Sequence, residues 1–125
     1  MLGASTDEEG RSRMFVEVDL YSGRPNPRFS LEAGAAAELA RRLGALAADG
    51  GGGRPYDGLG YRGLRVLGGA EEVLLSGGVV TVRGPGGSAR RLRDPGRELE
   101  RWLLDRGAGE LDPEVVAEAR RELAR

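Results

Sequence analysis

The chain has 125 residues, enough for one domain of ordinary size, and its 19 basic and 20 acidic residues leave a formal net charge of −1. That balance gives no positive field to attract nucleic acid or an anionic membrane, so we expect neither as a partner. Lysine, histidine and cysteine are absent, which excludes disulfides, thiol nucleophiles, imidazole bases and the usual zinc sites. We expect no cofactor, and an enzyme of this composition would depend on carboxylate, Arg, Tyr or Ser side chains.

The first eleven residues are polar and acidic, and they lack the basic and apolar regions of a signal peptide. We expect residues 1–11 to form a disordered tail and residues 12–125 to form a single α+β domain. No apolar run reaches the length of a membrane-spanning helix, so the expected location is the cytoplasm. The missing lysine and isoleucine indicate a GC-rich coding sequence.

Residues 14–20 alternate between apolar and polar side chains, which predicts a half-buried strand. Tyr-Ser-Gly-Arg-Pro-Asn-Pro-Arg-Phe follows at residues 21–29. Pro25 and Pro27 fix their own φ and push the residues before them toward extended geometry, while Gly23 can adopt a positive φ. Residues 21–29 are therefore predicted to form a stiff, extended loop whose shape is set before any ligand arrives.

This loop carries the candidate binding groups. The guanidinium groups of Arg24 and Arg28 suit bidentate pairing with a carboxylate or phosphate. Asn26 is the only asparagine in the chain, which indicates a specific task. The amide either shapes the turn through local hydrogen bonds or contacts a ligand, and both alternatives stay open. The candidate binding residues are Tyr21, Ser22, Gly23, Arg24, Asn26, Arg28 and Tyr61, with Tyr56 as a further aromatic contact.

Downstream of the loop, Ser30 is predicted to cap a helix that runs to about Ala48 along a stripe of leucines. Residues 49–60 contain four consecutive glycines, and we expect a flexible connection there, with a lid over the neighbouring site as the alternative. Further strands are predicted at residues 61–67, 72–76, 79–83 and 88–93. Gly77-Gly78 fits a two-residue hairpin turn.

Asp94-Pro95 and Asp112-Pro113 each predict a capping residue followed by proline in the first helical turn. Gly107 is expected to end the first of these two helices, and Trp102 is expected in the core beside Leu99. Counted without the return strand at residues 88–93, the elements give the order β-α-β-β-β-α-α. We therefore expect an α+β fold, with a mostly antiparallel sheet and helices packed on one face.

Glu17 and Asp19 lie two residues apart on the polar face of the first strand. Such carboxylates can bind Mg²⁺ or Ca²⁺ or act in acid–base chemistry, with Asp57 nearby. We favour a structural role, in which they pair with Arg24 or Arg28 and shape the loop.

Two other patterns are less specific. Residues 58–63 match G-x-G-x-x-G, but the match follows a loop and opens a strand, whereas a dinucleotide fingerprint opens a helix. Arginines surround the turn at residues 84–87, and acidic residues follow at once without interleaved aromatics, which favours a solvated hairpin over a phosphate site. These arginines are Arg83, Arg90, Arg91 and Arg93.

Three segments resemble a set of small uncharacterised proteins from bacteria and fungi that share an S-G-R-P-N-P segment after the first strand. The matching segments are S-G-R-P-N-P at residues 22–27, L-G-Y-R-G at residues 59–63 and D-P-x-R-x-L-E-x-W-L-L at residues 94–104. The similarity spans residues 15 to about 111. The set has no established activity, so the resemblance implies no residue roles.

From these features we expect a non-catalytic binding or accessory protein whose loop at residues 21–29 holds an anionic group or peptide of a partner. The partner is a protein, a peptide or a small anionic ligand. One alternative, by architecture alone, is a subunit that resembles precursor-peptide recognition domains beside peptide-modifying enzymes. The others are a carboxylate- or metal-dependent enzyme using Glu17 and Asp19, and a homodimer paired through a sheet edge.

Overall fold

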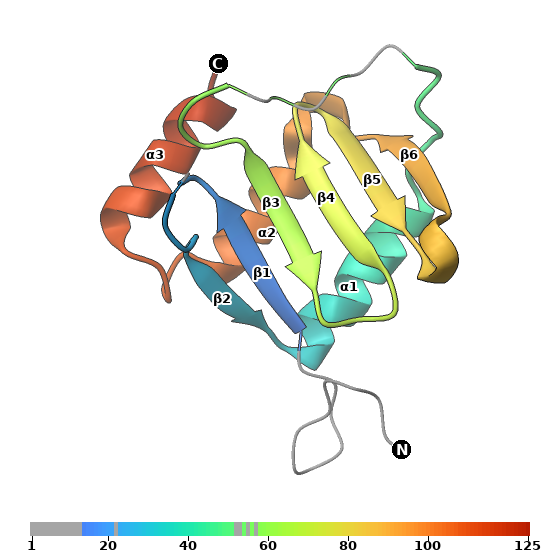
Figure 1. Ribbon diagram of the computed structural model, residues 1–125, viewed down its shortest axis with the longest axis horizontal. Coiled ribbons are helices and arrows are strands. Elements are labelled where there is room, and N and C mark those ends of the chain that lie inside the picture. The colour runs from blue at the N-terminus through green and yellow to red at the C-terminus, as the bar shows by residue number, and fades with distance from the viewer. Residues whose placement is uncertain (1–13, 22, 52–53, 55, 57) are drawn as a thin grey trace.

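The computed structural model describes residues 14–21, 23–51, 54, 56 and 58–125. The expected tail, residues 1–11, lies outside the described residues, as do Ser22 and Asp57. Six strands form one antiparallel sheet in the spatial order β2-β1-β3-β4-β5-β6 (Figure 1). They are β1 (Met14–Asp19), β2 (Arg28–Leu31), β3 (Gly63–Leu67), β4 (Glu72–Ser76), β5 (Val79–Arg83) and β6 (Ala89–Arg93).

Three α-helices cover one face of this sheet: α1 (Ala33–Gly44), α2 (Glu98–Gly107) and α3 (Pro113–Leu123). In Figure 1, α1 and α2 cross behind the strands, and α3 flanks α2 on the side of β1 and β2. The expected α+β fold, with a mostly antiparallel sheet and helices on one face, is confirmed. Within the part of the chain that the structure describes, no helix is both long and apolar enough to cross a membrane.

The core lies between the sheet and the helices, and it is built almost entirely from aliphatic side chains. Every second residue of the central strands is buried, as the alternation in β1 predicts: Val16 and Val18 point to the helices and Glu17 points away. Leucines and valines of the helices cover them, among them Leu39, Leu43, Leu99, Leu103, Leu104, Val115 and Val116. Burial of this apolar surface is the main stabilising term of the fold.

The β4–β5 hairpin forms at the residues predicted for it. Gly77 and Gly78 have φ values of 62° and 87°, and Ser76 pairs directly with Val79. Positive φ at both central residues is the requirement of the type I′ turn, which glycine meets without steric cost. The Asp112 cap also forms as predicted, because its Oδ1 accepts a hydrogen bond from the Glu114 N–H at 2.8 Å.

The region after the loop differs from the prediction. Arg28–Leu31 is a strand, so Ser30 does not cap a helix, and α1 begins at Ala33 after Glu32, which makes no side-chain capping bond. Phe29 and Leu31 are buried against the core, and this burial selects the strand over a capped helix start. The helix ends at Gly44, and residues 47–49 instead pair with β6.

The start of α2 is also more elaborate than a simple cap. A 3₁₀ turn, η2 (Pro95–Arg97), comes first, and the Asp94 carboxylate reaches across it to accept from the N–H groups of Leu99 at 2.9 Å and Glu100 at 3.1 Å. A second such turn, η1 (Pro85–Gly87), joins β5 to β6. Trp102, expected in the core, is only partly buried and lies beneath the guanidinium group of Arg42.

Candidate functional site

The loop between β1 and β2 is held in shape by Asn26. The Asn26 Oδ1 accepts hydrogen bonds from the N–H groups of Leu20 at 3.0 Å and Tyr21 at 2.7 Å. Its Nδ2 donates to Glu17 Oε2 at 3.1 Å. These are the contacts expected of the turn-shaping alternative. Because one amide connects the end of β1 to the start of β2, the backbone of the loop is organised without a ligand.

Arg62 fixes the same loop from a distant part of the chain. Its Nη2 donates to Asp19 Oδ1 at 2.8 Å and to the Tyr21 carbonyl at 3.1 Å, and its Nη1 donates to the Gly58 carbonyl at 3.4 Å. The hydrogen bond to Asp19 raises the pKa of the Arg62 guanidinium. Asp19 thus pairs with Arg62, not with Arg24 or Arg28 as predicted.

The two candidate acids therefore already have partners in the chain: Glu17 bonds to Asn26, and Asp19 bonds to Arg62. Among the residues that the structure describes, no three His, Cys, Asp or Glu side chains gather in a way that could hold a metal ion. Through these contacts, both carboxylates help to position the loop.

Arg24, in the loop, and Arg28, the first residue of β2, both have exposed side chains. Arg28 lies opposite Glu17, on the sheet face that carries no helix. The guanidinium of Arg24 lies 3.7 Å from the centroid of the Tyr21 ring, and that of Arg28 lies 5.9 Å from the centroid of the Phe15 ring. Stacking on an aromatic face orients the plane of a guanidinium group and leaves its N–H groups at the rim free to donate. Within the described residues, neither side chain forms an ion pair or a hydrogen bond.

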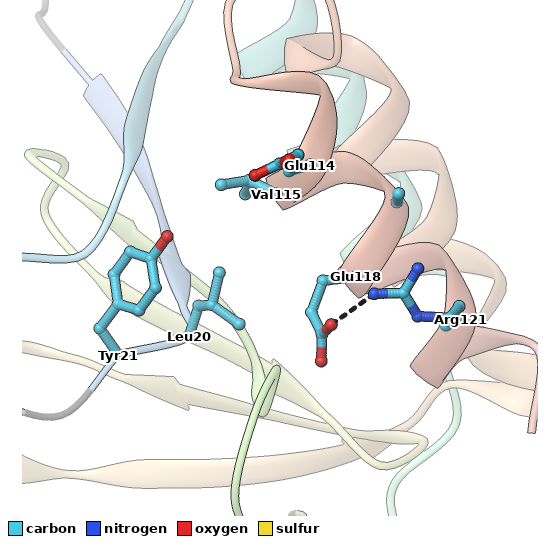
Figure 2. Close-up of a pocket in the computed structure, with 7 residues that line it drawn as sticks. Leu20, Tyr21, Glu114, Val115, Glu118 and Arg121 are labelled. Atoms are coloured by element: carbon cyan, nitrogen blue, oxygen red, sulfur yellow. Dashed lines mark hydrogen bonds and ion pairs between the residues drawn. The ribbon is translucent and has the colours of Figure 1, made fainter.

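A groove of about 430 Å³ separates this loop from α3 (Figure 2). Leu20 and Tyr21 form one wall, and α3 forms the other with Glu114, Val115, Ala117, Glu118 and Arg121. Figure 2 shows the Tyr21 ring facing the helix across the gap, and Glu118 bonded to Arg121 at 2.6 Å. The groove therefore combines apolar and charged wall residues, and one of them, Tyr21, lies against the exposed guanidinium group of Arg24.

Comparison of the chain with known protein families, characterised proteins and solved structures gave no match. Its function must therefore be inferred from the loop, the groove and their surroundings.

Tyr61 lies away from this groove, in the core. It is fully buried, and its hydroxyl donates to Glu100 Oε2 at 2.5 Å. Of the other candidates, Gly23 has a φ of 83°, as the loop requires, and Tyr56 is exposed above the β4–β5 hairpin, where its N–H donates to Ser76 Oγ. The structure thus brings Tyr21, Arg24 and Asn26 together, places Arg28 on the adjoining strand β2 and leaves Tyr61 in the core.

Sequence reasoning missed a buried ionic cluster around Glu100. Arg97 donates to both of its oxygens, with Nε to Oε1 at 3.1 Å and Nη2 to Oε2 at 3.0 Å. Burial raises the pKa of Glu100, although the hydrogen bonds from Arg97 and Tyr61 oppose that rise. The sequence does contain an indication that Glu100 is buried, because Glu100, Leu104 and Gly107 have the i, i+4, i+7 spacing of one helix face.

The remaining patterns have structural explanations. The G-x-G-x-x-G segment leads into β3, so it lacks the helix N-terminus that a dinucleotide motif needs. On β6, Arg91 and Arg93 project from the sheet face that carries no helix, whereas Arg90 lies opposite Val82, whose side chain points to the helices. The arginines of the hairpin are therefore divided between two faces.

Proposed function

We propose that this chain is a non-catalytic binding protein, and that the loop at residues 21–29 holds an anionic group, a carboxylate or phosphate, of a peptide partner. The observation that carries the proposal is the contrast within the loop. Asn26 and Arg62 form hydrogen bonds to the backbone of the loop. The guanidinium N–H groups of Arg24 and Arg28 face solvent instead. A loop organised in this way loses little conformational entropy when it binds.

Stacking supports the choice of an anion as ligand. A guanidinium group held close to an aromatic ring is restricted to fewer orientations, and its planar fork matches the two oxygens of a carboxylate or phosphate. Arg24 lies on Tyr21, which also lines the groove. An anion bound at Arg24 would therefore stand at the entrance to that groove.

The groove supports a peptide over an isolated ion. Its apolar wall residues, Leu20, Val115 and Ala117, offer contact area that a small inorganic anion cannot use. Glu114 and Glu118 on the opposite rim would repel a second negative charge. The site thus fits a chain segment in which one acidic group is followed by uncharged or basic residues.

The test is an NMR titration of the ¹⁵N-labelled protein with inorganic phosphate and with N-acetyl-aspartate amide. We expect the Nε–H signals of Arg24 and Arg28 to shift with both anions. Arg24→Gln and Arg28→Gln should each lower the affinity at least about threefold, because each removes one charge-assisted donor group. The thermal midpoint should stay near that of the natural chain, since both side chains are exposed.

Arg106→Gln is the matched control, because Arg106 is also exposed and stacks on an aromatic ring, at 5.5 Å from the Trp102 centroid, away from the loop. Its affinity for both anions should equal that of the natural chain. Equal shifts at Arg106 and Arg24 would mean nonspecific anion condensation and would reject the proposal. A loss of folded structure in Arg24→Gln would show that the side chain is structural.

A further inference from the structure

Among the residues that the structure describes, no strand pairs with the outer side of β2. The Val18 N–H donates to the Pro27 carbonyl at 2.8 Å, which marks residues 18 and 27 as a hydrogen-bonded pair. Such pairs alternate along an antiparallel ladder, so Phe29 and Leu31 bond to β1. Arg28 and Ser30 between them direct their N–H and C=O groups away from the sheet.

The opposite edge of the sheet does not share this property over its central residues. On β6, the Arg91 carbonyl accepts from the Asp49 N–H at 3.0 Å, and the Arg93 N–H donates to the Ala47 carbonyl at 2.8 Å. The segment at residues 47–49 therefore covers that edge. Unpaired edges favour strand addition, so β2 is the place where another chain can extend the sheet.

One side chain already stands at the β2 edge. Glu110, in the connection between α2 and α3, accepts from the Ser30 N–H through Oε1 at 3.4 Å. That distance is long for a hydrogen bond to a carboxylate, and the contact is exposed to solvent. The carboxylate oxygen occupies the position that the carbonyl of an added strand would take, and an exposed bond of this length is easily replaced.

Given the proposed function, on which this inference rests, we propose that the partner is an extended peptide that adds to the sheet as a strand beside β2. An acidic residue of the peptide lies opposite Arg28. Residues opposite one another in a ladder share a face, so its carboxylate meets the Arg28 guanidinium, while the peptide backbone bonds to Arg28 and Ser30. Glu110 swings away when the peptide binds.

Charge favours a peptide over a second copy of this chain. Pairing of two β2 edges would bring two Arg28 side chains onto one short ladder, and like charges on neighbouring strands repel one another. An acidic residue of a peptide instead brings an opposite charge to the exposed Arg28 guanidinium. The exposed guanidinium of Arg24, which comes just before the strand, adds to the attraction.

The probe is the peptide acetyl-Thr-Val-Asp-Val-Thr-amide, titrated into the ¹⁵N-labelled protein to about 5 mM. We expect the backbone amide signals of Arg28 and Ser30 to shift together. A peptide N-methylated at the residue whose N–H faces the edge should bind at least about tenfold more weakly, because one backbone hydrogen bond is lost and its partner is left unpaired. The aspartate and the two valines are N-methylated one at a time, in separate peptides. The residue whose N–H faces the edge of β2 is thereby among those tested. Replacing Asp by Asn in the peptide should weaken binding about threefold to fivefold.

Substitution of Glu110 is a second test, in which the affinity for the peptide is expected to rise instead of fall. Glu110→Ala should raise the affinity about threefold, because the competing acceptor and its charge are removed, and Glu110→Gln should give a smaller rise because the acceptor remains. Glu71→Ala, an exposed acid in the β3–β4 turn, is the control and should leave the affinity unchanged.

The outcomes separate the two proposals. If the Asp-to-Asn change and Arg24→Gln weaken binding but none of the N-methylated peptides loses affinity, the anion site stands and strand addition is wrong. If no peptide shifts the Arg28 or Ser30 amide at 5 mM, or if sedimentation shows that this edge joins two copies of the chain, the inference is overturned. Binding that survives Arg24→Gln and Arg28→Gln but fails on N-methylation would support strand addition alone, and it would reject both the anion site and the pairing of the peptide carboxylate with Arg28.

Discussion

The Tyr61 hydroxyl donates a 2.5 Å hydrogen bond to Glu100, and both residues are fully buried. The bond joins the segment just before β3 to the first turn of α2, across the interface between the sheet and the helices. Because the partly buried Arg97 binds the same carboxylate, both oxygens of the fully buried Glu100 have hydrogen-bond donors. A buried carboxylate in this position is tolerated only while its partners remain.

Tyr61→Phe should lower the free energy of unfolding by about 1–3 kcal/mol, because Glu100 loses a buried hydrogen-bond donor while the volume of the ring is retained. Urea denaturation followed by circular dichroism measures this. Tyr56→Phe is the control: its hydroxyl is exposed and makes a long 3.3 Å bond to the Leu59 carbonyl, so its effect should stay below about 0.5 kcal/mol. Equal effects of the two changes would contradict a special role for the buried bond.

The same cluster predicts a specific pH dependence. Burial raises the pKa of Glu100 above that of an exposed glutamate, so the folded chain holds this proton more tightly than the unfolded chain does. Its contribution to stability is complete below the ordinary glutamate pKa and is lost as the pH rises toward the raised value. The stability of the natural chain relative to Glu100→Gln should therefore fall as the pH increases through that window. Denaturation midpoints of both proteins at a series of pH values measure it, and a difference that grows with pH would show that the pKa is lowered.

Asn26→Asp tests the loop clamp with almost no change of shape. The new carboxylate can still accept from Leu20 and Tyr21, but it faces Glu17 without a proton to donate. We expect a loss of about 1–3 kcal/mol at neutral pH. The loss should shrink toward acid pH, because a proton on either carboxylate of the pair restores a donor between positions 17 and 26.

Glu17→Gln in the same molecule should restore most of the lost stability of Asn26→Asp, since an amide supplies the missing donor. Thermal melting of the single and double variants at two pH values completes the cycle. No rescue by the second change would mean that the contact between residues 17 and 26 contributes little to the shape of the loop.

Gly107→Ala should destabilise the fold by about 1–3 kcal/mol, although alanine is the better helix former. An added methyl group at this position would overlap the ring of Phe29, which is itself buried. Gly34→Ala in α1 is the matched control, because the methyl group there would meet no atom within 4 Å, and it should stabilise by up to about 1 kcal/mol. Calorimetry of both variants decides whether packing or helix propensity determines the effect of alanine at position 107 on stability.

Local patterns with a strict stereochemical requirement were predictable from the sequence. Gly77-Gly78 fixed both the turn type and the register of the β4–β5 hairpin, and Asp112-Pro113 marked the start of α3. In each case a few adjacent residues determine the conformation. The alternation in β1 was equally informative because it runs over six residues and one of its faces is buried.

The features that the sequence did not reveal depend on distant contacts. β2 has only four residues, too few for a periodic signal, and its strand conformation comes from pairing with β1 and from the burial of Phe29. Tyr61 follows a glycine-rich stretch that suggests an exposed loop, yet it is fully buried and bonds to Glu100. In the candidate site, the loop was predicted, but its support by Arg62 and the groove against α3 came from the tertiary structure.

Arg97 is the one non-glycine residue with a positive φ, 56°, among those that the structure describes. The positive φ at this position in the turn before α2 favours glycine. The buried carboxylate of Glu100, in contrast, requires a cation there. The two demands are satisfied together only as long as Glu100 is present. We therefore expect positions 97 and 100 to evolve as a unit: a lineage that replaces the glutamate with an apolar residue should soon exchange the arginine for glycine, and the reverse order should be rare.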